Sequence, residues 1–410
     1  MRREPAAANN QEMWLEALLA LIIEGYREFM EWWQTRSSLR ALRRAAGEES
    51  DSPSFVGDGR TVAPAAARAR LDEDDINAIL ARHARKHVGL VLGVCRQGQA
   101  WTFARGRIGA DQPRSPGPET IFELGSVTKV FTATVLADMV EEGLVTLDDP
   151  VQRYLPAGVE LPIRGRPITL ADLGTQTSGL PRLPPGLVRR SLGQRRNPYA
   201  RFTESDLERA TSRTPLKSRP GERLRYSNFG FGLLAYALAR RAEQPFEQLV
   251  RERICDPLGL ADTRISIPPE AQNRFADGHD RRGRPVPHWD LAALAGAGAL
   301  RSMIADLLGF LELQLRQPTT RLGRAAHATH QPRAHRGRVS QGLGWAGLPL
   351  RGDSRRMLWH NGGTGGFRTF VGFVKESEVG VAVLSNCSRS VDAIGFRILE
   401  ASNGGFAGTR

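Results

Sequence analysis

The sequence is poor in cysteine and lysine, and each shortage narrows what the protein can be. Its three cysteines, Cys95, Cys255 and Cys387, lie far apart and form no C-x-x-C pair. Neither a disulfide framework nor a zinc site is therefore predicted, and each cysteine is best explained as a small buried hydrophobe. Only four of the 57 lysine and arginine residues are lysines, at positions 86, 129, 217 and 375, which leaves 53 arginines.

The net charge of +13 is thus carried by arginines that are scattered along all 410 residues. A strongly basic chain raises nucleic acid as a partner, but no basic block, zinc-finger spacing, basic heptad region or stacked aromatic motif accompanies the charge. We predict no nucleic-acid partner. A hydrophobic content of 40% with 25% charged residues is typical of a soluble globular protein that is long enough to bury a large core.

No apolar run is long enough to cross a bilayer. The best candidate, residues 12–34, has its apolar core interrupted by Glu16. The same glutamate, and the lack of a small-residue cleavage site after it, make this segment a poor signal peptide. Aromatic and arginine side chains between residues 12 and 44 suit a membrane surface, and packing on a protein partner or on the main domain fits them equally well.

Three regions follow from the change in composition along the chain. Residues 1–46 are predicted to form an amphipathic helical extension. Residues 47–70 are rich in Gly, Ser, Asp, Ala, Pro and Arg without apolar periodicity, which indicates a linker. The main domain is therefore expected to span residues 71–410.

Strand patterns lie at the two ends of this domain, and the middle is mostly helical. Such an order predicts an α/β (α+β) fold, in which an antiparallel sheet made from both ends is flanked by the terminal helices and carries a mostly helical subdomain from about 120 to 340. Active sites often lie where two such parts of a domain meet. The expected helices are 72–86 and 391–402, and the expected strands are 88–95, 99–109, 356–360, 367–374 and 379–386.

A histidine-rich segment, HATHQPRAH, contains His327, His330 and His335. No carboxylates stand at zinc spacing beside these histidines. We predict a solvated loop here, and no metal site.

The stretch FELGSVTKVF places a serine and a lysine in an apolar run. If a helix opens near Ser126 and ends before Gly143, then Ser126 and Lys129 lie on one face at i and i+3. A serine hydroxyl needs an adjacent base to become a nucleophile, and a desolvated lysine with a lowered pKa can be that base. Because a serine three residues before a lysine also arises by chance, the pair alone is only suggestive.

Two further segments carry polar groups in unusual places. Tyr226 and Asn228 stand just ahead of an apolar helix, where a phenol can accept a proton if a nearby cation holds its pKa down; a helix cap beside a half-buried tyrosine explains them as well. The glycine-rich WHNGGTGGF offers His360 and Asn361, and the N–H of Gly363 could pair with that of Ser126 as an oxyanion hole.

Together the three motifs resemble those of the serine β-lactamase and penicillin-binding-protein family, specifically its class C branch. The resemblance runs from about residue 71 to residue 402 and excludes residues 1–70. It rests on SVTK, YSN and HNG in this order and at these separations, and on the segments TSGLP, NPYARFT, DPLGLADT, AGAGALRS and GLGW.

The resemblance implies a β-lactamase/transpeptidase-like fold and a role for each motif residue. Ser126 would be the acylated nucleophile, Lys129 its proton acceptor, Tyr226 the base that relays protons and activates the deacylating water, and Asn228 a substrate-orienting amide. His360, Asn361, Gly362 and Gly363 would bind substrate or line the oxyanion hole.

The resemblance also implies the activity, with alternatives left open. We expect a serine hydrolase that acts through an acyl-enzyme on β-lactams or peptidoglycan-type D-Ala-D-Ala peptides, without a cofactor. His360 stands where class C enzymes usually have lysine, and histidine there is typical of related D-alanyl-D-alanine carboxypeptidases and esterases. An esterase of small acyl esters, or a non-catalytic binding module on this scaffold, is the alternative. The family works mostly in the periplasm or outside the cell.

Overall fold

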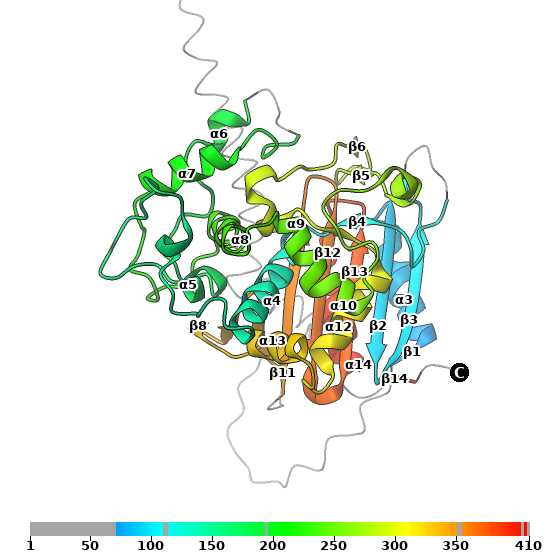
Figure 1. Cartoon of the computed structure of the whole chain (residues 1–410). Coiled ribbons are helices and arrows are strands. Elements are labelled where there is room, and N and C mark those ends of the chain that lie inside the picture. The colour runs from blue at the N-terminus through cyan, green and yellow to red at the C-terminus, as the bar shows by residue number, and fades with distance from the viewer. Residues whose placement is uncertain (1–70, 110–113, 193–195, 351–354, 403–405, 408–410) are drawn as a thin grey trace, which may run out of the picture. The chain divides into compact units, whose positions relative to one another are not determined.

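The computed structural model describes residues 71–109, 114–192, 196–350, 355–402 and 406–407. The predicted N-terminal extension and linker, with their suggested membrane-surface contact, lie outside these residues. The described chain forms an antiparallel sheet with helices on both of its faces (Figure 1).

Eight strands make the main sheet, in the order β3-β2-β13-β12-β11-β10-β9-β8, with every neighbouring pair antiparallel. Strands β2, β12 and β13 are buried along nearly their whole length because helices cover both sides of the sheet. The bounds are β2 Gly89–Arg96, β3 Gln99–Gly106, β8 Ala334–Arg336, β9 Val339–Gln341, β10 Ala346–Pro349, β11 Arg356–Gly363, β12 Arg368–Val374 and β13 Val379–Ser385.

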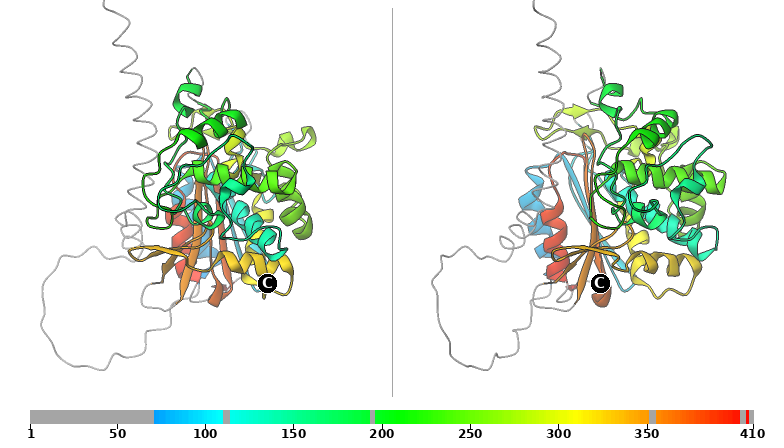
Figure 2. Two further views of the ribbon diagram at one scale, coloured as in Figure 1. Left: turned by 60° about the vertical axis from the view of Figure 1, so that its left-hand side comes forward. Right: turned by 90° about the vertical axis from the view of Figure 1, so that its left-hand side faces the viewer.

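The helices nearest the two ends of the domain, α3 (Glu73–Ala84) and α14 (Asp392–Ser402), pack together on one face of the sheet (Figure 2). Acids in the first turn of α3 and bases in its last complement the helix dipole. Between β2 and β3, Gln97 and Gly98 both have positive φ angles, which is typical of a two-residue hairpin turn. The expected terminal helices and the five expected strands are therefore confirmed, with bounds that shift by a few residues.

The helical subdomain lies on the other face of the sheet, where α12 contacts β2, β12 and β13 (Figure 2). Two short antiparallel pairs, β4 (Phe122–Glu123) with β7 (Arg301–Ser302) and β5 (Gly278–His279) with β6 (Pro285–Val286), stand within it. Its α-helices are α4 Thr128–Glu141, α5 Leu170–Gly174, α6 Leu187–Arg190, α7 Glu204–Arg213, α8 Asn228–Ala242, α9 Phe246–Val250, α10 Asp256–Leu258, α11 Ala295–Gly298, α12 Ile304–Leu315 and α13 Arg321–Thr329.

Helix α4 is the centre of this subdomain. Every residue from Thr128 to Met139 is buried, as expected for a helix that is surrounded by protein on all sides. It contacts α8, α11 and α13, and Gly143 follows its end with φ +77°, a conformation that glycine adopts easily after a helix. The predicted helix end before Gly143 is confirmed.

The predicted solvated loop around the three histidines is wrong. His327 belongs to α13, and His330 follows that helix with its ring 4.9 Å from the Phe373 ring. His335 lies in β8, where it is exposed. The loop prediction failed because α13 presents mainly leucine, glycine and alanine to the core, a weak apolar pattern among many arginines.

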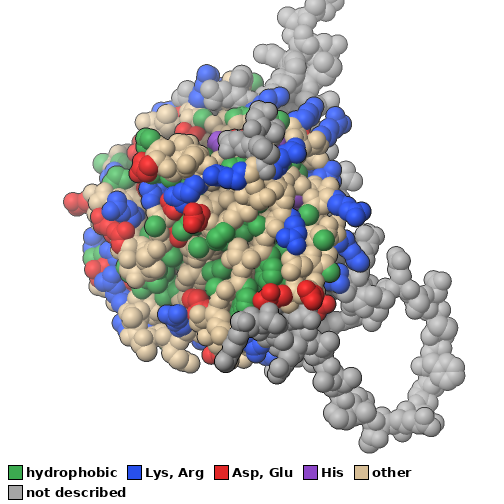
Figure 3. All heavy atoms as spheres, turned by 90° about the vertical axis from the view of Figure 1, so that its right-hand side faces the viewer, with side chains coloured by type: hydrophobic (Ala, Val, Ile, Leu, Met, Phe, Trp, Pro, Cys, Tyr) green, Lys and Arg blue, Asp and Glu red, His purple; other side chains and the backbone are tan. Residues whose placement is uncertain are grey.

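Many arginines of the described chain are used inside the fold. Arg253 and Arg321 both pair with the fully buried Asp138, at 2.7 and 2.9 Å. On the face shown in Figure 3, basic side chains are interspersed with acidic and hydrophobic ones. Among the described helices, none combines the length and the apolar composition that a membrane span requires.

Candidate active site

Ser126 lies in a single 3₁₀ turn, Gly125–Val127, that leads directly into α4. Gly125 has φ +52°, and a Cβ on it would lie 2.5 Å from the backbone nitrogen of Gly363. Only glycine fits this close approach between the turn and the end of β11. The turn therefore brings a half-buried serine hydroxyl to the strand that carries the third motif.

Backbone and side-chain bonds hold this turn from two sides. The Leu124 N–H donates to the Leu300 carbonyl at 2.8 Å, and the Thr369 hydroxyl donates to the Leu124 carbonyl at 2.7 Å. On the helix side, the Leu300 N–H donates to the Thr128 hydroxyl at 3.1 Å. The turn is thus fixed between the segment around β7 and the sheet strand β12.

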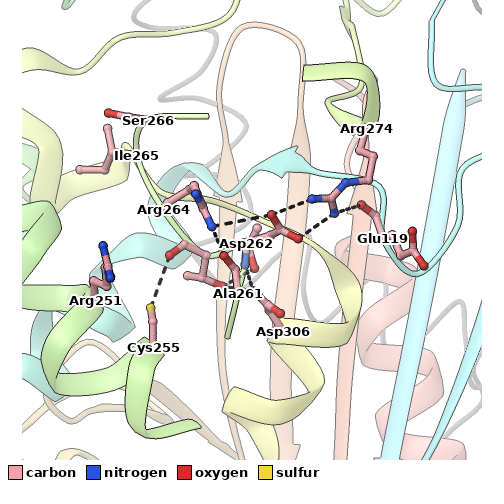
Figure 4. A network of polar contacts seen from close by, with 12 residues as sticks. Glu119, Arg251, Cys255, Ala261, Asp262, Arg264, Ile265, Ser266, Arg274 and Asp306 are labelled. Atoms are coloured by element: carbon pink, nitrogen blue, oxygen red, sulfur yellow. Dashed lines mark hydrogen bonds and ion pairs between the residues drawn. The ribbon is translucent and has the colours of Figure 1, made fainter. Parts of the chain in front are cut away.

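A buried polar network braces β7 in turn (Figure 4). Asp306, near the start of α12, accepts from the Asp262 N–H and the Thr263 hydroxyl, both at 2.9 Å. The Thr263 hydroxyl also lies 2.7 Å from that of Ser302 in β7, and Asp262 forms a bidentate pair with Arg274. Since β7 pairs with β4 just before Ser126, this network supports the serine from a distance.

Lys129 is fully buried, with an exposed fraction of 0%. Its Nζ donates to Ser126 Oγ at 3.0 Å and to the Ala297 carbonyl of α11 at 2.6 Å. Burial lowers the pKa of the Lys129 amine well below its usual value, and the positive charge of Arg182 lowers it further. A neutral amine beside a serine hydroxyl can take up the proton of that hydroxyl.

The third member of the cluster is Tyr226, whose hydroxyl donates to Ser126 Oγ at 2.7 Å. The Lys129 Nζ lies 4.8 Å from the centre of its ring. Burial raises the pKa of the Tyr226 phenol to about 12, whereas Arg182 and the bond to Ser126 oppose that rise. The condition named for proton acceptance, a cation that holds the pKa of this phenol down, is met only in part: Arg182 lowers the pKa, but desolvation is the larger effect and the net shift is upward.

Gln176 holds both neighbours of Tyr226. Its carbonyl accepts from the Arg225 N–H and its side-chain oxygen accepts from the Ser227 N–H, each at 2.7 Å. The Ser227 hydroxyl accepts from the Gly230 N–H and so caps α8. The tyrosine is thus fixed on a short turn that is bonded on either side to Gln176, the residue before the TSGLP segment.

Asn228 is the first residue of α8, immediately after that turn. Its side chain is hydrogen bonded to the Tyr199 phenol, and its buried Oδ1 has no hydrogen-bond partner among the described residues. Burying an unpartnered amide oxygen costs free energy. The atom is therefore a candidate acceptor for a donor that arrives with the substrate.

His360 is neutral, and it faces Tyr226 with 6.4 Å between the ring centres. Its Nδ1 donates to the Asn361 carbonyl at 2.6 Å, which leaves Nε2 as an acceptor. Burial, and next the charge of Lys129, lower the pKa of His360 to about 3. The third motif thus contributes no positive charge through this residue.

The other third-motif residues differ in where they point. The Asn361 amide donates to Asp392 of α14 at 3.1 Å, so this donor is held outside the Ser126 cluster, as the alternation of side chains along a strand requires. Gly362 packs against the Ser126 turn so closely that a Cβ would lie 3.1 Å from the Ser126 nitrogen. Gly363 approaches Gly125, and its side of the strand is exposed.

Three important contacts were not predicted from the sequence. Gln176, Ala297 and Arg182 all belong to segments, TSGLP with its flanking residues and AGAGALRS, that were noted only for their resemblance to the family. The run of small residues around Ala297, which permits close backbone approach, is a signal that could have found this contact. Gln176, whose φ is +61° in the structure, and Arg182 carry no comparable signal in the sequence.

The sheet, the helical subdomain and the Ser-Lys-Tyr cluster define a serine hydrolase of the β-lactamase/transpeptidase-like fold. The model of the family described as Beta-lactamase matches residues 68–401. The chain belongs to this family.

Individual relatives agree with this assignment. A beta-lactamase of Pseudomonas fluorescens is 29% identical over 334 residues, which cover 73% of this chain and 88% of that protein. The D-alanyl-D-alanine-carboxypeptidase/endopeptidase AmpH of Escherichia coli K12 is 30% identical over 285 residues, or 66% of this chain and 71% of that protein. The crystal structure of a class C beta-lactamase from Rhodobacter sphaeroides matches with a TM-score of 0.70 at 25% identity, over 80% of this chain and 97% of that chain.

Proposed function

We propose that the chain hydrolyses β-lactams or D-Ala-D-Ala peptides through an acyl-enzyme on Ser126. The observation that carries this proposal is the position of Ser126 Oγ, which lies 3.0 Å from Lys129 Nζ and 2.7 Å from the Tyr226 hydroxyl. A nucleophile, a neutral amine and a protonated phenol in mutual contact suffice for acyl transfer without a cofactor.

Acylation needs a base and an acid, and the two side chains supply them. As Ser126 Oγ bonds to the substrate carbonyl carbon, Lys129 takes the hydroxyl proton. When the carbon–nitrogen bond breaks, Tyr226 gives its proton to the leaving nitrogen, and the proton on Lys129 restores the phenol. The raised pKa of Tyr226 suits a proton donor, and the lowered pKa of Lys129 suits an acceptor.

The backbone N–H groups of Ser126 and Gly363 are the proposed oxyanion hole. The close packing of Gly125 and Gly362 at this point supports the assignment, because it brings the two chain segments that carry these groups together. The unpartnered Oδ1 of Asn228 would accept a hydrogen bond from an amide of the substrate. The name of the AmpH relative supports a peptide substrate with a D-Ala-D-Ala end.

Hydrolysis of small acyl esters is the second candidate, and the neutral His360 favours it. A neutral group at this position attracts a substrate carboxylate less strongly than a lysine would. A substrate without a carboxylate therefore gives up less binding free energy when histidine stands here. The same three side chains would carry out the same acyl transfer.

The proposal is tested by measuring rates with a chromogenic cephalosporin, a D-Ala-D-Ala peptide and a nitrophenyl ester, together with mass spectrometry of the trapped adduct. We expect the adduct on Ser126, and Ser126→Ala should abolish labelling by a fluorescent penicillin while the melting temperature stays unchanged. Faster turnover of the ester than of both other substrates would favour the second candidate. Labelling of Ser126→Ala as strong as that of the wild type would contradict both.

A further inference from the structure

Arg182 lies beside the site, although it belongs to none of the three motifs. Its guanidinium carbon is 5.2 Å from the centre of the Tyr226 ring. Its carbonyl accepts from the Phe229 N–H at 3.2 Å, and the carbonyl of the preceding Pro181 accepts from the Ser227 hydroxyl at 2.6 Å. The backbone around Arg182 is thus bonded to the turn that carries Tyr226.

Polar and charged side chains from several elements face Tyr226. Ser126 and Lys129 approach from the start of α4, and His360 approaches from β11. Tyr199 and Asn228 lie on the side of α8. His360 is neutral, and burial favours the neutral form of Lys129.

A guanidinium, in contrast, stays protonated over the whole working range of an enzyme. The charge of Arg182 acts on three groups of this cluster, because it favours proton loss from Lys129, Tyr226 and Tyr199 alike. All three effects have the same sign. Among the described residues, this is the permanent charge that those three side chains share.

We propose that Arg182 is a positioning residue for proton transfer at Ser126. Its guanidinium, held over the Tyr226 ring, supplies the fixed positive charge that favours a neutral Lys129 and, once Tyr226 has given its proton to the leaving group, the phenolate that remains, in place of a third-motif cation. This inference rests on the proposed function of Ser126. It assigns to the loop after TSGLP a role in setting the pH at which the enzyme becomes active.

The test is the pH dependence of Ser126 acylation in single-turnover experiments with a nitrophenyl ester and a fluorescent penicillin. The rate should rise with pH as Lys129 loses its proton. In Arg182→Gln this rising limb should move up by about one pH unit, with about tenfold slower acylation on the acidic side of it, as expected for the loss of a positive charge next to the Ser126 cluster.

Two further variants distinguish an effect of the Arg182 charge from an effect of its side-chain packing. Arg182→Lys keeps the charge and should return most of the limb to its wild-type position. Arg225→Gln removes an exposed arginine next to Tyr226 in the chain and should leave the limb in place, since a solvated charge is screened. If Arg182 had a merely structural role, the limb of Arg182→Lys would instead match that of Arg182→Gln and lie apart from that of Arg225→Gln.

Each result bears on the inference. An unshifted limb in Arg182→Gln, a limb in Arg182→Lys that matches Arg182→Gln, or an equal shift in Arg225→Gln would overturn it. Failure of the proposed function looks different, because wild-type Ser126 would then form no adduct with either reagent at any pH.

Discussion

Replacement of Gly362 by alanine tests whether packing of the third-motif strand positions the nucleophile. A Cβ at this position would overlap the Leu124 carbonyl oxygen and the Thr369 hydroxyl, and would lie 3.1 Å from the Ser126 nitrogen. The Cβ would lie about 1 Å closer to the carbonyl oxygen than real Cβ atoms come to other heavy atoms. Because this clash is with the backbone and not with a flexible side chain, the backbone must move.

The expected magnitudes follow from that displacement. Overpacking of this kind costs about 1–3 kcal/mol of stability, and a shift of about 1 Å at a reacting group can slow a reaction by about 10²-fold. The bond from the Thr369 hydroxyl to the Leu124 carbonyl, which is 2.7 Å long, should be lost or lengthened as well. Gly362→Ala should therefore lower both the melting temperature and the acylation rate.

The assay is the rate of Ser126 labelling by a fluorescent penicillin, measured with thermal unfolding of the same samples. Gly117→Ala is the matched control, because a Cβ there meets nothing within 4 Å and the backbone is not in the left-handed region. The control should label at the wild-type rate. If Gly362→Ala also labels at that rate with an unchanged melting temperature, the packing of β11 on the serine turn is not what positions Ser126.

Three other substitutions test the roles of individual side chains. Tyr226→Phe should slow deacylation by about 10²-fold or more, so that the acyl-enzyme accumulates in mass spectra; unchanged turnover would exclude the proton relay. Lys129→Met should slow acylation by about 10²- to 10⁴-fold. The pKa of Lys129 is lowered on folding, so at pH values between its folded and unfolded pKa the unfolded chain binds more protons than the folded one. Wild-type stability should therefore rise with pH towards 10, and that of Lys129→Met should lack this rise. Urea unfolding that gives the same change in stability between pH 7 and pH 10 for both proteins would contradict this. Asp306→Ala leaves the buried Asp262 N–H without its acceptor, removes one of the two partners of the Thr263 hydroxyl, and should lower stability by about 1–3 kcal/mol while Ser126 is still labelled; an unchanged urea midpoint would show that the network is not stabilising.

Local patterns in the sequence predicted much of this architecture. Ser126 and Lys129 could be paired from their spacing alone, because i and i+3 positions share a helix face. The terminal strands could be found because short runs rich in β-branched and aromatic residues lie there between turn residues. Strands β8, β9 and β10 were not predicted, since each has only three or four residues and the register of the sheet, rather than their own composition, makes them strands.

The electrostatics of the site could not be predicted in the same way. The pKa of Tyr226 depends on burial by segments far away in the chain, whereas from the sequence a nearby cation could be named only as a condition for proton acceptance. Lys129 donates to Ala297, which is 168 positions away, and Ser227 donates to Gln176, 51 positions away. Contacts over such separations follow from tertiary packing, which local propensity does not encode.

The same electrostatics bear on which step limits turnover. Deacylation requires a base for the attacking water, and burial raises the pKa of the Tyr226 phenol to about 12, which disfavours the phenolate at neutral pH. Acylation meets less of this barrier, because burial favours the neutral form of Lys129 and Tyr226 carries the proton that the leaving group needs. An arrangement of this kind favours fast formation and slow breakdown of the acyl-enzyme. We therefore expect the acyl-enzyme formed with a β-lactam to break down more slowly than it forms, and the charge of Arg182 over the Tyr226 ring to influence the ratio of the two rates.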